Sequence, residues 1–128
     1  MPSSPTCPEQ AELTGLRILV VEDEAAISLL LEDMLIELGF AVVGPAGRVG
    51  AALKHVEADA IDLAILDVNV AGQPIYPVVE ALVGKGVPFV FSTGYGAGGI
   101  DQAYRDRPVL QKPFSQADLD RKLRDALG

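Results

Sequence analysis

The stretch RILVVEDE at residues 17–24 decides the fold. It begins with an almost continuously apolar run of β-formers, which is typical of a strand buried on both faces of a sheet. Three carboxylates follow directly, at Glu22, Asp23 and Glu24. A strand that is covered on both sides and ends in acidic residues predicts a parallel sheet with a polar site at its carboxyl edge.

Helical and strand-like segments alternate outward from this stretch. Apolar residues at helical spacing cover residues 25–38, and Gly39 provides a stop signal. Further strands are expected at 41–44, 61–66, 88–92 and 109–111, and further helices at 50–57, 76–83 and 116–127. This alternation predicts an α/β fold: a doubly wound, five-stranded parallel sheet with helices on both faces. Between residues 94 and 107 the chain is glycine-rich with a weak helical pattern at 100–105, so the fourth helix is expected to be short or mobile.

Composition limits the domain organisation and the classes of function. With 128 residues the chain has the size of one domain, and we expect a flexible N-terminal arm at 1–15 followed by a single domain at 16–128. The 18 acidic and 10 basic side chains give a net charge of −8, which disfavours direct binding of nucleic acid. Cys7 is the only cysteine, and no secretory signal or membrane-spanning run is evident. We therefore expect a cytoplasmic protein that does not bind membranes.

Polar residues follow the expected strands at the points where these end. They are Glu22 and Asp23 after the first strand, Asp67 and Asn69 after the third, Thr93 after the fourth and Lys112 after the fifth. The carboxyl ends of parallel strands lie at one edge of the sheet, so these residues should converge. Crowded carboxylates need a cation, and oxygen ligands suit Mg²⁺ or Mn²⁺. An Asp carboxylate could then attack a phosphoryl group whose charge the metal and a lysine neutralise.

Four motifs carry a resemblance to a known family: VVEDE at 20–24, AILDVN at 64–69, STG at 92–94 and QKPF at 111–114. Over residues 16–127 the chain resembles the receiver domain of response regulators in two-component signalling. The resemblance implies that Glu22 and Asp23 bind the metal and that Asp67 accepts the phosphoryl group. It also implies that Asn69 lends its backbone carbonyl to the metal and that Thr93 and Lys112 contact the phosphoryl group.

A narrower resemblance concerns FVFSTGYG at 89–96 and VLQKPF at 109–114, which are similar to the FATGUY-type single-domain regulators of alphaproteobacteria. It implies a histidine kinase, including the HWE/HisKA2 type, or a histidine phosphotransfer protein as phosphoryl donor. Because no output domain follows the last helix, we expect signalling by protein contact or action as a phosphate relay or sink. No enzymatic activity beyond slow self-catalysed phosphotransfer and dephosphorylation is expected. Val109 departs from the pattern, because many receivers carry an aromatic residue there.

Three alternatives remain at this stage. A Mg²⁺-dependent phosphatase with an aspartate nucleophile would need a general acid where the chain has Asn69. A flavodoxin-like cofactor carrier would place a phosphate against the carboxylates at 22–24, which would repel it. The chain could also be the receiver of a longer regulator.

Away from the strand ends, Leu29 and Ile36 lie off the main apolar stripe of the first helix, which indicates either a broad buried face or a docking surface.

Overall fold

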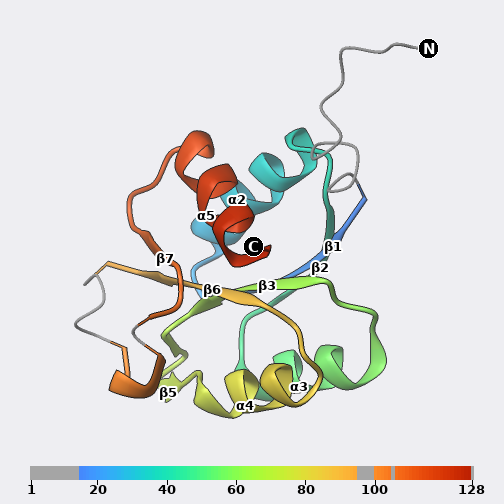
Figure 1. The fold of residues 1–128 in the computed structure, drawn as a ribbon, viewed down its shortest axis with the longest axis vertical. Coiled ribbons are helices and arrows are strands. Elements are labelled where there is room, and N and C mark those ends of the chain that lie inside the picture. The colour runs from blue at the N-terminus through green and yellow to red at the C-terminus, as the bar shows by residue number, and fades with distance from the viewer. Residues whose placement is uncertain (1–14, 95–99, 105, 128) are drawn as a thin grey trace.

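The computed structural model describes residues 15–94, 100–104 and 106–127. A central sheet lies between two layers of helices (Figure 1). The helices α2 (Ala25–Glu37) and α5 (Gln116–Leu127) cover one face. The other face is covered by α3 (Val49–Ala58) and α4 (Tyr76–Gly84). The predicted doubly wound α/β fold is therefore confirmed.

The sheet has five parallel strands in the order β2-β1-β3-β6-β7. They are β1 (Arg17–Val21), β2 (Ala41–Ala46), β3 (Leu63–Asp67), β6 (Phe89–Thr93) and β7 (Val109–Gln111). The chain runs from β1 outward to β2 and then returns to β3 on the other side of β1. This reversal of strand order opens a crevice at the carboxyl ends of β1 and β3, which is the usual ligand position in such sheets.

The two core layers explain the apolar run in β1. Ile18 and Val20 belong to the core beneath α2 and α5, whereas Leu19 and Val21 belong to the core beneath α3 and α4. All four side chains are buried, because alternate residues of a strand point to opposite faces and both faces are covered here. This packing fixes the direction in which the acidic residues after Val21 leave the sheet.

A short antiparallel hairpin after β3 was not expected from the sequence. It consists of β4 (Asn69–Val70) and β5 (Gln73–Pro74). The turn between them holds Ala71 at φ 52 and Gly72 at φ 82, both in the left-handed region. Two-residue strands carry no readable periodicity, so the pattern could not reveal them.

The connection between β6 and β7 is nearly devoid of helix in its described part. It contains the 3₁₀ turn η2 (Gln102–Tyr104), where the sequence predicted a weak helix at 100–105. The expected shortening of the fourth helix is thus confirmed. Residues 95–99, which include Tyr95 of the motif at 89–96, lie outside the described residues, as do residues 1–14 of the arm expected at 1–15. Among the helices that are described, none has the length and apolar character needed to cross a membrane.

Candidate functional site

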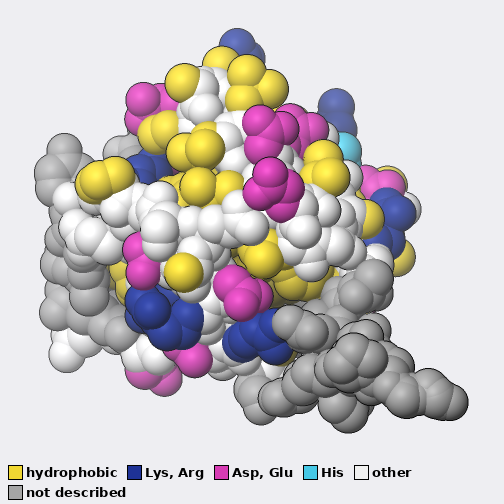
Figure 2. All heavy atoms as spheres, turned by 90° about the horizontal axis from the view of Figure 1, so that it is seen from above, with side chains coloured by type: hydrophobic (Ala, Val, Ile, Leu, Met, Phe, Trp, Pro, Cys, Tyr) yellow, Lys and Arg dark blue, Asp and Glu magenta, His cyan; other side chains and the backbone are white. Residues whose placement is uncertain are grey.

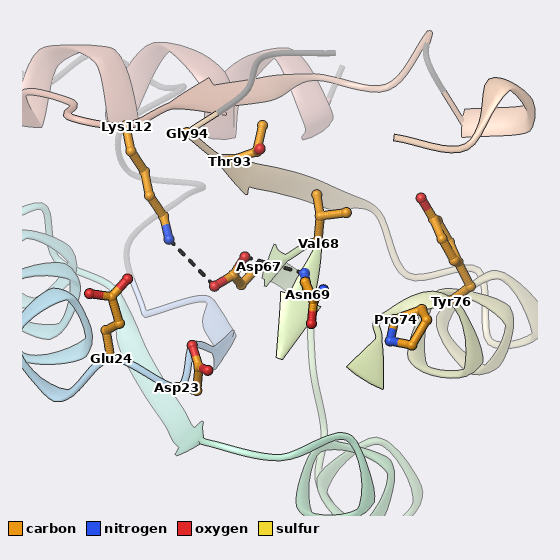
Figure 3. A pocket seen from close by; sticks show the side chains of 10 residues that line it. All are labelled: Asp23, Glu24, Asp67, Val68, Asn69, Pro74, Tyr76, Thr93, Gly94 and Lys112. Atoms are coloured by element: carbon orange, nitrogen blue, oxygen red, sulfur yellow. Dashed lines mark hydrogen bonds and ion pairs between the residues drawn. The ribbon is translucent and has the colours of Figure 1, made fainter. Parts of the chain in front are cut away.

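A pocket of about 830 Å³ opens at the carboxyl edge of the sheet (Figure 3). Its lining consists of Asp23, Glu24, Asp67, Val68, Asn69, Pro74, Tyr76, Thr93, Gly94 and Lys112. These residues come from the ends of β1, β3, β6 and β7, from the β4–β5 hairpin and from the start of α4. The predicted convergence of strand ends is therefore observed in the fold.

Asp67 is the last residue of β3 and points into this pocket (Figure 3). Its side chain is 14% exposed, so it is shielded but reachable. One carboxylate oxygen, Oδ2, lies 3.4 Å from Nζ of Lys112, and Oδ1 accepts a long hydrogen bond of 3.4 Å from the backbone N–H of Asn69. A carboxylate held between an ammonium and a backbone amide is oriented, as a nucleophile must be.

Glu22 lies behind the pocket and is almost fully buried, with 1% of its side chain exposed. Its Oε2 accepts a hydrogen bond of 2.9 Å from Nζ of Lys112, and its Oε1 accepts one of 3.2 Å from the backbone N–H of Glu24. Burial raises the pKa of Glu22 to about 7, although both hydrogen bonds oppose the rise. Burial disfavours the charged form of Lys112, but its hydrogen bond to Glu22 and the charge of Asp67 outweigh this effect and raise the pKa of Lys112.

Asp23 completes an acidic cluster with Glu22 and Asp67. One ligand oxygen from each of the three residues lies within 4.8 Å of the others. Asp23 is exposed, and its Oδ2 accepts a 2.9 Å hydrogen bond from the backbone N–H of Ala71 in the hairpin turn. A purely oxygen-based donor set of high negative charge fits Mg²⁺, which favours few carboxylates and retains space for water and phosphate oxygens.

Thr93 and Asn69 lie at the rim of the same pocket. Thr93 ends β6, is buried, and its carbonyl accepts a 2.9 Å hydrogen bond from the backbone N–H of Lys112. This bond ties the end of β6 to the residue that contacts Asp67. Ser92 is also buried, and its Oγ has no hydrogen-bond partner among the described residues. Ser92 is not among the residues that line the pocket.

Three contributors to the pocket were missed from the sequence. The backbone N–H of Ala71 holds Asp23, and Pro74 and Tyr76 form the wall opposite Lys112. The amide of Ala71 has no signature in a side-chain pattern, since its role depends on the turn conformation. The Tyr-Pro pair at residues 76–77 marks the start of a helix but not a pocket wall.

The first helix exposes part of its apolar surface. Leu29 is 61% exposed and Ile36 is 60% exposed, so the alternative of a broad buried face is wrong. Figure 2 looks onto the face that carries α2 and α5 and shows hydrophobic side chains among acidic ones. His55, the only histidine of the chain, lies on α3 and contacts Asp59 at 2.7 Å, away from the acidic cluster.

Known proteins share this fold and, in part, this sequence. The solution structure of SdrG from Sphingomonas melonis Fr1 is 45% identical, with a TM-score of 0.82 over 89% of this chain and 98% of SdrG. SdrG is also known in a BeF3-activated conformation. The response regulator protein TrrA from Thermotoga maritima, in complex with Mg²⁺-BeF, is 29% identical, with a TM-score of 0.76 over 88% of this chain and 99% of TrrA.

A further relative is longer than this chain. The transcriptional regulatory protein PdtaR of Mycobacterium tuberculosis is 34% identical over 107 residues, which are 80% of this chain and 52% of PdtaR. The chain thus spans about half the length of that relative. No protein-family model matches the chain.

Proposed function

Since this chain belongs to the receiver domains of response regulators, we propose that its Asp67 accepts a phosphoryl group in a Mg²⁺-dependent reaction. The observation that carries the proposal is the position of Asp67. It lies at 3.4 Å from Lys112, next to the carboxylates of Glu22 and Asp23, in a pocket open to a donor. A single Asp with a cation on one side and a metal-type cluster on the other is equipped for phosphoryl transfer.

The proposed transfer uses the oxygens of Asp67 as the nucleophile. A carboxylate oxygen attacks the phosphorus of a phosphohistidine, the N–P bond breaks, and its electron pair stays on the imidazole of the donor. The product is an aspartyl phosphate. Lys112 already contacts Asp67 and would move its ammonium toward the phosphoryl oxygens, while the hydroxyl of Thr93 at the rim would donate a hydrogen bond to one of them.

The acidic cluster would hold the metal. Glu22, Asp23 and Asp67 supply carboxylate oxygens, and the backbone carbonyl of Asn69 is the proposed fourth protein ligand. When bound, Mg²⁺ neutralises charge that develops on the phosphoryl oxygens. Asn69 also argues against the phosphatase alternative, because an amide N–H is too weak an acid to protonate a leaving group.

Response regulators receive phosphoryl groups from kinases, and we propose the type of donor for this chain from its sequence. The motif at 89–96 supports a histidine kinase of the HWE/HisKA2 type or a histidine phosphotransfer protein. We infer that the phosphorylated chain then acts through protein contact or passes the phosphoryl group on. Its net charge of −8 opposes direct contact with nucleic acid.

The test is the intact mass of the chain after incubation with acetyl phosphate and Mg²⁺. We expect one phosphoryl adduct in the wild type, which disappears when EDTA is added before the donor. The variant Asp67→Asn should carry no adduct, because an amide oxygen is a poor nucleophile.

The matched control is Asp125→Asn, which removes an exposed carboxylate on α5. It should be labelled like the wild type. An adduct that persists in Asp67→Asn would place the phosphoacceptor elsewhere. If acetyl phosphate and a phosphorylated histidine kinase both fail to label the wild type, the proposed function is wrong.

A further inference from the structure

Tyr76 joins the pocket to a segment that the proposed chemistry does not use. It is the first residue of α4 and lines the pocket on the side opposite Lys112 (Figure 3). Its hydroxyl oxygen accepts a 2.6 Å hydrogen bond from the backbone N–H of Asp101. Asp101 lies in the connection between β6 and β7, directly before η2. One side chain therefore contacts both the pocket and this connection.

The ring of Tyr76 makes a second contact with the same connection. It stacks on Tyr104, with ring centroids 5.8 Å apart and planes inclined by 15°. Tyr104 in turn lies 6.4 Å from the rings of Phe89 and Phe91 on β6. Aromatic pairs at these separations attract one another and constrain each other's orientation. The strand that ends at Thr93 and the wall formed by Tyr76 thus hold the connection between them.

A short backbone path leads from the phosphoacceptor to Tyr76. Val68 follows Asp67, and its carbonyl accepts a 3.0 Å hydrogen bond from the N–H of Ile75, the residue before Tyr76. One backbone hydrogen bond therefore links the residue after Asp67 to the residue before Tyr76. Residue 109, where many receivers carry an aromatic ring, is Val109, a partly buried aliphatic side chain.

We propose that Tyr76 is a positioning residue that couples the state of Asp67 to residues 100–104 through its hydroxyl bond to Asp101 and its stack on Tyr104. The proposal rests on the proposed function, since Asp67 must carry the phosphoryl group. Because residue 109 on β7 is a valine in this chain, the proposal assigns the coupling role to an aromatic residue at the start of α4 instead. Residues 101–104 then form the part of the surface that reports phosphorylation.

The test compares ¹H–¹⁵N spectra of the full chain with and without Mg²⁺ and BeF₃⁻, which mimics the phosphoryl group. Tyr76→Phe removes only the oxygen that accepts from Asp101 and keeps the ring. Tyr104→Phe is the matched control, because the described side-chain contacts of Tyr104 are made by its ring. In the wild type, BeF₃⁻ should shift the amides beside Asp67 and those at 101–104.

In Tyr76→Phe the amides beside Asp67 should shift as in the wild type, while the response at 101–104 falls at least about twofold. Tyr104→Phe should respond like the wild type. A merely structural role of Tyr76 would instead weaken both sets of shifts together or neither. The inference is overturned if residues 101–104 of Tyr76→Phe respond fully, or if they do not respond in the wild type. If, in the wild type, the amides beside Asp67 do not shift either when Mg²⁺ and BeF₃⁻ are added, the proposed function itself has failed.

Discussion

Burial of Glu22 makes the stability of the metal-free protein dependent on pH. Its pKa rises from 4.5 in a solvated chain to about 7 in the fold, mainly because burial disfavours the carboxylate. Between these values the folded protein keeps a proton that the unfolded chain releases. The stabilisation that follows from this raised pKa is complete below pH 4.5 and is lost as the pH rises through 7.

The substitution Glu22→Gln should remove the loss of stability that accompanies ionisation of Glu22. We expect the variant, in EDTA, to be more stable than the wild type at pH 8, by on the order of 1–3 kcal/mol, and to show a flatter dependence of its unfolding free energy on pH between 5 and 8. Urea denaturation at several pH values measures both. Equal slopes for variant and wild type would show that Glu22 ionises normally in the fold. Mg²⁺ should stabilise the wild type more than the variant, because the variant lacks one carboxylate ligand.

Lys112 should matter for phosphoryl transfer and not for metal binding. Lys112→Ala removes a cation that lies 2.9 Å from Glu22 and 3.4 Å from Asp67. Because this cation competes with Mg²⁺ for the same carboxylates, we expect unchanged or tighter Mg²⁺ binding, measured by calorimetry. The rate of labelling by acetyl phosphate should fall about 100-fold, as when one electrostatic contact to a transferring group is lost. Lys54→Ala on the exposed side of α3 is the control, and a parallel loss of metal affinity in Lys112→Ala would contradict this division of roles.

At the scale of elements, two glycines with positive φ have different reasons to be glycine. A Cβ at Gly44, φ +90, would lie 2.8 Å from the backbone N of Ala46 and 3.2 Å from the carbonyl oxygen of Val20. At Gly72, φ +82, a Cβ would meet no atom within 4 Å. Conformational strain is common to both sites, but a clash with backbone occurs only at Gly44.

Alanine at the two positions should separate these effects. Gly72→Ala should cost about 1 kcal/mol, the strain of a left-handed residue. Gly44→Ala should cost on the order of 2–4 kcal/mol, because the neighbouring strand backbone must move as well. Thermal and urea unfolding of both variants and the wild type measure these losses in unfolding free energy. Similar losses in both variants would mean that β2 accommodates the methyl group.

A comparison of the expected and observed bounds of the elements shows which parts of the secondary structure could be predicted from the sequence. The bounds of β1, β7 and α5 agree with the prediction, since continuous apolar runs and a Ser115 cap mark them. The second strand was expected to end at residue 44, but β2 continues to Ala46, whose carbonyl accepts a hydrogen bond from the N–H of Glu22. Gly-Pro at 44–45 is a stop signal locally, and pairing with the neighbouring strand β1 overrides it. Local patterns cannot report such a tertiary hydrogen bond.

The candidate site was more predictable than the loops that support it. Asp67, Lys112 and Thr93 follow from strand ends, because topology alone brings these ends together. The bond from Ala71 to Asp23 and the contacts of Tyr76 depend on a two-residue hairpin and on a turn before η2. Their geometry is set by left-handed backbone and by ring packing. Neither has a periodic signature in the sequence.

At the scale of the whole molecule, the doubly wound sheet places the chemistry at one edge and leaves a helical face beside it. The helix α2 begins two residues after Asp23, so its N-terminus lies beside the acidic cluster that contains Asp67. Leu29 and Ile36 are seven residues apart and therefore lie on one stripe of it, both largely exposed. Acidic side chains accompany them on α2, at Glu32, Asp33 and Glu37. Figure 2 shows hydrophobic and acidic side chains next to one another on the face that carries α2 and α5. The face suits a partner with an apolar stripe and a basic rim.

The double variant Leu29→Ala/Ile36→Ala should therefore slow transfer from a phosphorylated histidine kinase that labels the wild type. Each truncation removes apolar contact worth about 1 kcal/mol at an interface, so kcat/KM for transfer should fall roughly 30-fold in total. Labelling by acetyl phosphate should not change, since a small donor needs no docking. Val83→Ala is the control, because Val83 is an apolar side chain of α4, 49% exposed, on the opposite helical layer. Equal losses in the two variants, or slower labelling by acetyl phosphate in the double variant, would show that the α2 face does not receive the donor.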